Sequence, residues 1–263
     1  MTTTTTTTTT PGPQPMTAAQ LIEMLQLSKS SDSVELKLTV PDADRRATVR
    51  ALEIDPLGAR VRQIVFFDTP DLVLNRHGIV VRARRTQGKG DDSVVKLRPV
   101  VPAELPAKLR KEVDFKVEVD AMPGGFVCSG SYKGTLGPDA VKPVLAGDKP
   151  IRTLFSKPQR AFFTEHAPDG IALNDLAVLG PITTMKLKFQ PTGFSRAMVG
   201  ELWMYPDGSH IVELSTKCTP AEAIDVVAES KAFLTSRGVD LGGEQQTKTK
   251  TALEFFVKEL RES

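Results

Sequence analysis

The chain has 263 residues, enough for one large domain or two small ones. Its 34 lysine and arginine residues nearly balance its 32 aspartate and glutamate residues, so bulk charge does not indicate a nucleic-acid-binding protein. The two cysteines, Cys128 and Cys218, form neither a metal-binding spacing nor a disulfide framework. The sequence shows no apolar run of membrane-spanning length and no signal-peptide pattern. These features predict a cytoplasmic protein that does not enter membranes.

The amino-terminal part of the chain predicts a tail, two helices and a strand. Residues 1–15 are a threonine tract with proline and glycine, which has no apolar face to bury and should be disordered. Residues 16–27 have the apolar spacing of a short amphipathic helix, with Thr17 as its candidate N-cap. Residues 33–40, SVELKLTV, alternate strictly between polar and apolar side chains, which predicts a half-buried strand. A second short helix is expected within residues 41–55.

Two pairs of cations lie on two predicted strands that are joined by a hairpin loop at residues 87–93. Arg82 and Arg84 are two residues apart, and so are Lys96 and Arg98. Because residues i and i+2 of a strand point to the same face, each strand presents a pair of positive charges on one face. These four cations could form a site for a polyanion, or they could belong to the solvated face of an ordinary sheet.

The middle of the chain combines a clear strand with a long irregular segment. Residues 110–120, RKEVDFKVEVD, place charged side chains on one face and valine and phenylalanine on the other. Its last two carboxylates, Glu118 and Asp120, are expected to reach solvent at the far end of the strand. Residues 121–150 are rich in glycine and proline, and they predict a loop with one short helix.

The carboxy-terminal part predicts three strands followed by two helices. The strands are expected at residues 185–189, 200–205 and 210–217, and the helices at residues 220–237 and 247–262. The whole pattern therefore contains eight or nine strands without a βαβ rhythm, which favours an antiparallel sheet and a mainly β fold of the α+β type. An open sheet and a closed barrel have the same side-chain period, so periodicity leaves that choice open.

A family resemblance adds to this pattern. The segments FDTPDLVLNRHGIVVRARR and VKLRP resemble the CYTH superfamily of triphosphate tunnel metalloenzymes, which includes class IV adenylate cyclases, thiamine triphosphatases and inorganic triphosphatases. The resemblance implies a closed antiparallel β-barrel of about eight strands, with a charged lumen and helices packed outside. It also implies that residues 16–263 form a single tunnel domain after the tail at residues 1–15.

The resemblance assigns functional residues motif by motif. The family opens on a Glu-x-Glu-x-Lys strand; Glu35 and Lys37 match it, whereas Ser33 replaces the first glutamate. Arg110 and Glu112 resemble the Arg-x-Glu pattern of the family.

The resemblance continues in the second half of the chain and completes the set of expected site residues. Lys157 and Arg160 resemble the basic pair of another strand, and MKLKF replaces the usual Glu-x-Glu strand, so the late carboxylates are expected from Glu201 and Glu213. The expected catalytic residues are Glu35 and Lys37. The expected substrate-binding residues are Lys37, Arg82, Arg84, Lys96, Arg98, Arg110, Arg160, Lys186 and Lys188. The expected metal ligands are Glu35, Glu112, Glu201 and Glu213.

A tunnel lined by these residues would suit a triphosphate. Enclosed cations repel one another and are costly without a counter-charge, and arginine and lysine are the residues that bind phosphate. Carboxylates beside a phosphate site usually hold Mg²⁺ or Mn²⁺ through oxygen ligands. The sequence therefore predicts divalent-metal-dependent hydrolysis of an inorganic or organic triphosphate.

Several alternatives remain open from the sequence. The first is a class IV type of adenylate cyclase that makes cyclic AMP from ATP, and the second is a non-catalytic protein that binds a triphosphate or polyphosphate. A face that binds nucleic acid or an acidic protein is disfavoured by the near-neutral charge of the chain. The sequence leaves the oligomeric state open, with a homodimer as one option.

Overall fold

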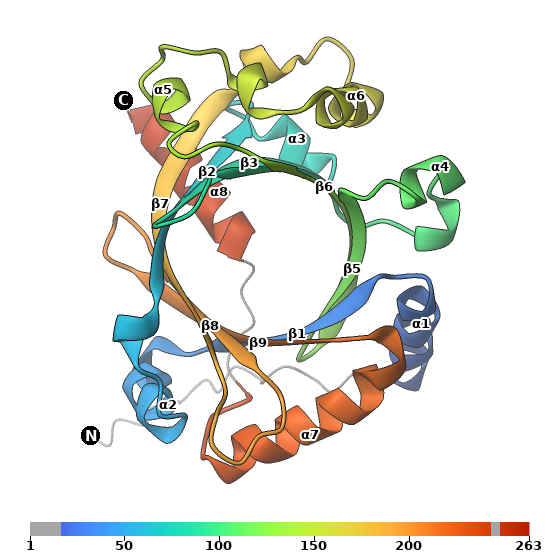
Figure 1. The fold of residues 1–263 in the computed structure, drawn as a ribbon, viewed down its shortest axis with the longest axis vertical. Coiled ribbons are helices and arrows are strands. Elements are labelled where there is room, and N and C mark those ends of the chain that lie inside the picture. Colours follow the sequence, from blue (N-terminus) through green and yellow to red (C-terminus); the bar gives the residue numbers. More distant parts are fainter. Residues whose placement is uncertain (1–16, 243–247, 263) are drawn as a thin grey trace, which may run out of the picture.

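The computed structural model describes residues 17–242 and 248–262, and within them the chain forms nine strands and eight α-helices (Figure 1). The strands are β1 (Ser33–Val40), β2 (Arg60–Asp68), β3 (Ile79–Thr86), β4 (Asp92–Leu97), β5 (Phe115–Met122), β6 (Gly125–Thr135), β7 (Ala177–Phe189), β8 (Met198–Met204) and β9 (His210–Cys218). The helices are α1 (Ala18–Lys29), α2 (Arg45–Ala51), α3 (Val73–Arg76), α4 (Ala107–Arg110), α5 (Lys142–Leu145), α6 (Lys157–His166), α7 (Ala223–Ser236) and α8 (Lys248–Glu262). The expected tail at residues 1–15 lies outside the described residues, so the division into a tail and one domain stays a prediction.

The strands close into one barrel in the order β1-β5-β6-β4-β3-β2-β7-β8-β9, and β9 pairs back onto β1 (Figure 1). Neighbouring strands are antiparallel except β1 and β5, which run parallel. The closed barrel implied by the sequence resemblance is therefore confirmed, with one parallel pair among its strands. Because side chains alternate across each strand, closure turns one set of side chains into the lumen and the other set outward.

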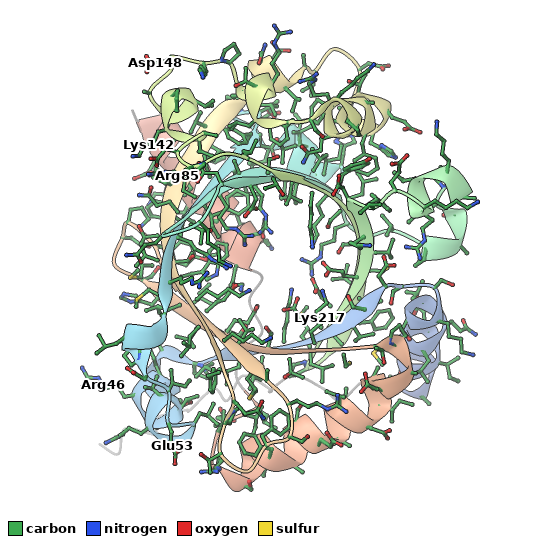
Figure 2. All side chains as sticks on the ribbon, in the orientation of Figure 1. Arg46, Glu53, Arg85, Lys142, Asp148 and Lys217 are labelled. Carbon is green, nitrogen blue, oxygen red and sulfur yellow. The ribbon has the colours of Figure 1, made fainter. Side chains whose placement is uncertain are left out.

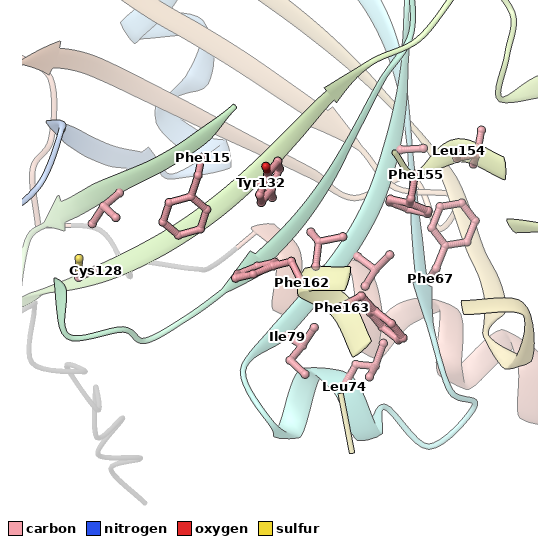
Figure 3. Close-up of a cluster of buried hydrophobic side chains, with 14 of the residues drawn as sticks. Phe67, Leu74, Ile79, Phe115, Cys128, Tyr132, Leu154, Phe155, Phe162 and Phe163 are labelled. Atoms are coloured by element: carbon pink, nitrogen blue, oxygen red, sulfur yellow. The ribbon is translucent and has the colours of Figure 1, made fainter. Parts of the chain in front are cut away.

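The largest apolar core lies between the outer face of the barrel and α6 (Figure 3). The ring of Phe162 from α6 packs at 5.5 Å from the ring of Phe115 on β5 and 5.9 Å from that of Tyr132 on β6. The buried side chain of Gln159 donates from Nε2 to the carbonyl oxygens of Ser93 and Tyr132, at 3.2 Å each. These contacts fix α6 on the outside of β4 and β6.

The two carboxy-terminal helices cover opposite faces of the barrel wall. Phe233 and Leu234 of α7 pack against Leu38 and Leu214, whose side chains point outward. This is the outside packing that the sequence resemblance implies for helices.

Helix α8 instead packs on the inner side of the barrel wall, and in Figure 1 its first turn lies within the ring of strands. Its Leu253 and Phe256 pack with Phe66 and Trp203. Phe66 is the cross-strand partner of Arg82, and cross-strand partners share a face of the sheet, so both point into the lumen. Helix α8 therefore covers part of one end of the tunnel.

Three sequence predictions of secondary structure need correction. The strand expected over residues 110–120 begins only at Phe115, because α4 and a turn occupy the residues before it. The segment with Lys157 is the helix α6 and not a strand, because Ser156 caps it by accepting a hydrogen bond from the Gln159 amide at 3.4 Å. The expected loop at residues 121–150 contains β6, whose glycine-rich sequence is held as a strand by pairing with β4 and β5 on its two sides.

Candidate functional site

The inside of the barrel contains a cavity of about 270 Å³ that is lined mainly by charged side chains (Figure 2). Its cations are Lys37, Arg82, Lys96, Arg98, Lys133, Lys186 and Lys248. Its carboxylates are Glu35, Glu118, Asp120, Glu201 and Glu213. Seven cations against five carboxylates leave the lining of this cavity with a positive excess, as a site for an anion requires.

Lys37 lies between two carboxylates on the β1 and β5 side of the lumen. Its Nζ is 2.8 Å from Oδ1 of Asp120 and 3.3 Å from Oε2 of Glu35. Burial disfavours the charge on Lys37, but Asp120, Glu35 and Glu213 outweigh burial, so the pKa of Lys37 is raised above its ordinary value. Lys37 is therefore a fixed positive charge at neutral pH and not a proton acceptor.

The β3 and β4 side of the lumen is different, because two of its cations form no ion pair with a carboxylate of the described residues. Arg82 and Lys96 are the cations of the described cavity lining that have no carboxylate within 4.0 Å. Burial is the main reason that the pKa of Arg82 is lowered and that the pKa of Lys96 is lowered to about 8. Neighbouring cations, Arg84 beside Arg82 and Lys37 beside Lys96, lower both pKa values further.

Arg84 and Arg98 flank this pair and have partners of their own. Arg84 donates from Nε to Oδ2 of Asp92 at 2.8 Å, and its Nη2 is 2.7 Å from the same oxygen. Arg98 has a weaker ion pair, with its Nη2 at 3.6 Å from Oδ2 of Asp120. Arg98 therefore keeps more of its charge available to a ligand than Arg84 does.

The backbone at Arg98 is held next to β3 by a glycine. The amide of Arg98 donates to the carbonyl oxygen of Gly78 at 2.7 Å, which continues the pairing beyond the last residue of β4. Gly78 has φ of 72°, and a Cβ at this position would lie 2.4 Å from the carbonyl oxygen of Arg98. Only glycine allows this close approach, so the Gly78 turn is part of what positions Arg98.

The opposite wall, formed by β8 and β9, carries two carboxylates that the protein neutralises itself. Glu201 and Glu213 are direct cross-strand partners. Lys248 from α8 lies between them, with its Nζ 2.6 Å from Oε2 of Glu201 and 2.8 Å from Oε1 of Glu213. Lys186 adds a further ion pair, 2.9 Å from Oε1 of Glu201. Burial favours protonation of Glu201, but Lys248 and Lys186 outweigh it and hold its pKa well below the usual range.

Four residues that the sequence assigned to the tunnel lie elsewhere. Arg110 is the last residue of α4, and it donates from Nη2 to the carbonyl oxygen of Ser30 at 2.7 Å on the outside of the barrel. Glu112 is exposed in the turn before β5. Arg160 is exposed on α6, where its Nη1 donates to the carbonyl oxygen of a residue in the preceding turn. Lys188 is exposed near the end of β7 and does not line the cavity.

Four lumen residues were missed or misplaced by the sequence analysis. Glu118 and Asp120 share a face of β5, and the structure corrects their expected position at the solvent end of the strand: they line the lumen. Their alternation with Lys116 was the available signal. Lys133 lies on β6, whose glycine-rich composition predicts a loop. Lys248 reaches the lumen from α8, and no local sequence pattern predicts that this helix contributes to the lumen.

The lumen carboxylates do not form a ready-made metal site. In the parts of the chain that the structure describes, no three aspartate, glutamate, histidine or cysteine side chains gather closely enough to hold an ion. Glu201 and Glu213 are bridged by Lys248 instead. Mg²⁺ often takes only one or two protein carboxylates and completes its shell with phosphate oxygens and water. The residues present therefore fit an ion that is shared with a phosphate ligand, and they do not fit an ion held by the protein alone.

The barrel and its lumen can be compared with known proteins. No protein-family model matches the chain, and no curated protein sequence matches it. A solved structure of a candidate adenylate cyclase from Bacillus halodurans matches with a TM-score of 0.59 and 14% identity, over 84% of this chain and 97% of that chain. A solved structure of the candidate adenylyl cyclase HpAC1 from Hippeastrum, described as having a dominant triphosphatase activity, matches with a TM-score of 0.61 and 16% identity, over 84% of this chain and 95% of that chain.

These two likenesses cover nearly the whole length of both solved structures. At such low identity they concern the fold, and the residues of the lumen have to be argued from this chain. The closed barrel that the sequence motifs imply is therefore a fold that this chain shares with these two solved structures.

Proposed function

We propose that the barrel binds the triphosphate group of a substrate in its lumen and hydrolyses it. The observation that supports binding most directly is the pair formed by Arg82 and Lys96, which are enclosed and have no carboxylate of residues 17–242 or 248–262 within 4.0 Å. A buried charge without a partner lowers stability, and a bound anion would offset that cost. The guanidinium of Arg82 can bind two phosphate oxygens at once, while Lys96 supplies a compact charge.

The neighbouring residues have complementary roles in this proposal. Arg98 and Lys37 extend the positive surface on the two sides of Lys96, and Lys37 stays charged because of Asp120 and Glu35. Glu35 is a lumen carboxylate 3.3 Å from Lys37, and we assign to it the orientation of the water that attacks the terminal phosphorus. Lys37 and Arg82 would then stabilise the charge that develops on the phosphate oxygens.

A divalent cation, Mg²⁺ or Mn²⁺, would enter with the triphosphate under this proposal. Glu201 and Glu213 are the adjacent carboxylates that could add oxygen ligands to it, once Lys248 no longer bridges them. When bound, such an ion neutralises part of the phosphate charge.

Two other functions have support from particular observations. Adenylate cyclase activity is supported by the descriptions of both structural neighbours, which name them as candidate cyclases. A binding protein without catalysis is supported by the ion pairs of Glu201 and Glu213 with Lys248, which leave fewer free carboxylates for a metal. We favour hydrolysis because it needs only water and a held triphosphate, whereas cyclisation needs precise placement of a ribose hydroxyl group.

One set of incubations tests these functions against one another. The full chain is mixed with tripolyphosphate, ATP or thiamine triphosphate, each with Mg²⁺ or Mn²⁺, and assayed for phosphate, pyrophosphate and cyclic AMP. We expect phosphate release that is lost in Glu35→Gln. Cyclic AMP with pyrophosphate would establish the cyclase instead, and tight binding without any turnover would establish the binding protein.

The remaining expectations concern location and partners. None of the helices in residues 17–242 and 248–262 is both long and apolar enough to cross a membrane. The cytoplasmic location, a homodimer, and a triphosphate-containing molecule or polyphosphate as partner stay predictions.

A further inference from the structure

A cavity of about 470 Å³ lies on the outside of the barrel, between the strands and α7. Figure 1 shows α7 running along the outer side of β9 and β1. The outward-facing side chains of Leu36 and Leu38 on β1 and Leu214 on β9 form its floor. Because these residues alternate with residues that line the lumen, such as Lys37, this cavity and the lumen lie on opposite faces of the same strands. We call it the outer cavity.

The outer cavity lies where two neighbouring strands part. The pairing of β1 with β5 ends at Leu36 and Ala121, whereas the pairing of β1 with β9 continues to Val40. Beyond β5 the chain turns toward β6 through Pro123 and Gly124, and both of these residues line the cavity. The described side chains leave the space between this turn, β1 and α7 unfilled.

One face of α7 turns two polar side chains toward this apolar space. Four residues that are three or four positions apart share this face and line the cavity: Val227, Ser230, Lys231 and Leu234. No aspartate or glutamate among the described residues lines it. A serine and a lysine between two apolar residues add nothing to the packing of α7 on the barrel, so we examined what else they could bind.

The hydroxyl group of Ser230 has no hydrogen-bond partner within the described residues. The residue is 8% exposed, and its Oγ is buried. Thr216 lines the same cavity from β9 and shows the usual arrangement, because its Oγ1 donates to the carbonyl oxygen of Ala197 at 2.8 Å. A buried hydroxyl group without a partner lowers stability. A ligand that brings a hydrogen-bond acceptor to Ser230 would offset this cost.

Lys231 supplies a positive charge at the opening of the cavity. The residue is exposed although it lines the cavity, so it lies where the cavity meets solvent. It forms no ion pair with a carboxylate of residues 17–242 and 248–262. The ammonium group of Lys231 and the neighbouring hydroxyl group of Ser230 are both donors, and together they suit the two oxygens of a carboxylate.

We infer that the outer cavity binds a free, single-chain carboxylic acid of medium length. Its apolar chain lies against the leucines of β1 and β9, and its carboxylate accepts a hydrogen bond from Ser230 and pairs with Lys231. Apolar walls with a few polar groups are typical of ligand pockets, which usually enclose about 300–1,000 Å³, and the outer cavity lies within this range. The inference does not depend on the proposed function of the lumen.

Two ligands that differ only in the head group test this inference. Decanoate and 1-decanol are titrated into the full chain by calorimetry, and we expect decanoate to bind more tightly. Ser230→Leu should weaken both ligands at least about tenfold, because the new side chain displaces the ligand chain from the wall. Lys231→Gln should weaken decanoate about two- to fivefold, as for the loss of an exposed ion pair, and leave decanol unchanged.

Ser230→Ala tests the hydroxyl group without filling the cavity. It should weaken decanoate about two- to tenfold, the effect of one hydrogen bond. Its melting temperature should not fall, because the substitution removes a buried hydroxyl group that has no partner among the described residues in the free protein. A serine that only stabilises α7 would give the opposite result, a lower melting temperature with unchanged affinity.

Ser236→Leu and Lys149→Gln are the matched controls. Ser236 is exposed near the end of the same helix, Lys149 is an exposed lysine, and neither residue lines the outer cavity. We expect both variants to bind decanoate as the wild type does, and thermal melting of all variants checks that they fold. Should Ser230→Leu not fold, Ser230→Ala and Lys231→Gln still test the site.

Three outcomes would overturn the inference. The first is that the wild-type protein does not bind decanoate. The second is that a folded Ser230→Leu variant binds it unchanged, which would place the ligand elsewhere. The third is that decanol binds as tightly as decanoate and Lys231→Gln has no effect, which would show that the site does not recognise a carboxylate.

Discussion

The two opposite walls of the tunnel differ in whether their charged side chains are paired within the protein. On the β8 and β9 wall, Glu201 and Glu213 are bridged by Lys248 at 2.6 and 2.8 Å, so the charges are balanced by the protein itself. On the β3 and β4 wall, no carboxylate in the part of the chain that the structure describes lies within 4.0 Å of Arg82 or Lys96, so their charges have no direct ion pair. The charges of the first wall are balanced without a ligand, whereas under the proposed function those of the second wall are balanced by the bound anion. Removing a cation from the first wall should therefore lower stability, whereas removing a cation from the second wall should weaken binding without lowering stability.

The largest effect is expected from Lys248→Met, which removes the cation between two buried carboxylates. Losing one partner of a buried ion pair typically costs about 3–5 kcal/mol, and we expect about 3 because Lys186 still compensates Glu201. Urea unfolding measures the change in the free energy of unfolding.

Lys250→Met is the control on the same helix. The side chain of Lys250 is 69% exposed and pairs with Glu254 at 3.8 Å, so its loss should cost about 0.5 kcal/mol or less. Equal destabilisation by both substitutions would show that the bridge between Glu201 and Glu213 has no special role.

The second effect compares two arginines on β3. Arg82→Met should weaken tripolyphosphate binding by about 1.5–3 kcal/mol, the range for a hydrogen bond to a charged group, because Arg82 forms no ion pair within 4.0 Å among the described residues. Arg84→Met should cost less than about 1.5 kcal/mol, because Arg84 already pairs with Asp92 at 2.7 Å. Calorimetry measures both affinities. A larger loss in Arg84→Met than in Arg82→Met would move the phosphate site toward the end of the tunnel at Asp92.

The third effect is a pH dependence of binding that is due to Lys96. Because burial lowers its pKa to about 8, Lys96 is mostly charged at pH 7 and mostly neutral at pH 9. Loss of this charge should weaken tripolyphosphate binding up to about tenfold between these pH values, which corresponds to about 1.4 kcal/mol. Lys96→Arg should remove the dependence because arginine stays charged. A wild-type affinity that is constant from pH 7 to pH 9 would contradict the assignment.

Replacing Lys96 should raise the stability of the protein while it weakens tripolyphosphate binding. The pKa of Lys96 is about 8 in the folded protein and 10.5 in the unfolded chain, so between these values the unfolded chain binds more protons. This group therefore makes stability rise with pH from about 8 to 10.5, and below about 8 its burial costs stability in full. We expect Lys96→Met to raise the melting temperature at pH 7 by about 2–4 °C per kcal/mol gained, while it weakens tripolyphosphate binding. A lower melting temperature would show that the charge on Lys96 is compensated within the protein.

The smallest effect is expected outside the tunnel. Arg110→Ala and Arg160→Ala should leave tripolyphosphate affinity unchanged, because both side chains bind backbone carbonyl oxygens on the outer surface. Calorimetry that showed a loss in either variant would place a phosphate contact outside the barrel.

The local sequence determined much of the strand and turn structure. The motif around Asp68 shows this, because its carboxylate accepts backbone hydrogen bonds from Thr69, Leu74 and Asn75 at 2.7–2.9 Å and so shapes the turn by itself. The alternation of polar and apolar residues in β3 and β4 likewise places Arg82 and Lys96 on charged faces, whichever strands pair with β3 and β4. Ser156 as N-cap and Pro158 in the first turn also indicate the helix α6 locally, whereas the family resemblance implies a strand at these residues.

Other features depended on contacts between distant parts of the chain. β6 has a glycine-rich sequence that is compatible with a loop, and only its pairing with β4 and β5 makes it a strand. The period of two that marks a charged face is the same in an open sheet and in a barrel. The pairing of β9 with β1, where Thr39 faces Glu213, closed the barrel and turned that face inward.

By itself the sequence therefore determined which face of each strand carries the charged residues, because side chains alternate along a strand. Only the tertiary structure decided which of these charges are balanced. Lys37 meets Asp120 through the pairing of β1 with β5, and Lys248 meets Glu201 across 47 residues of chain. Arg82 and Lys96 receive no such partner from the described residues, because an ion pair depends on distance in space and closure of the barrel sets that distance.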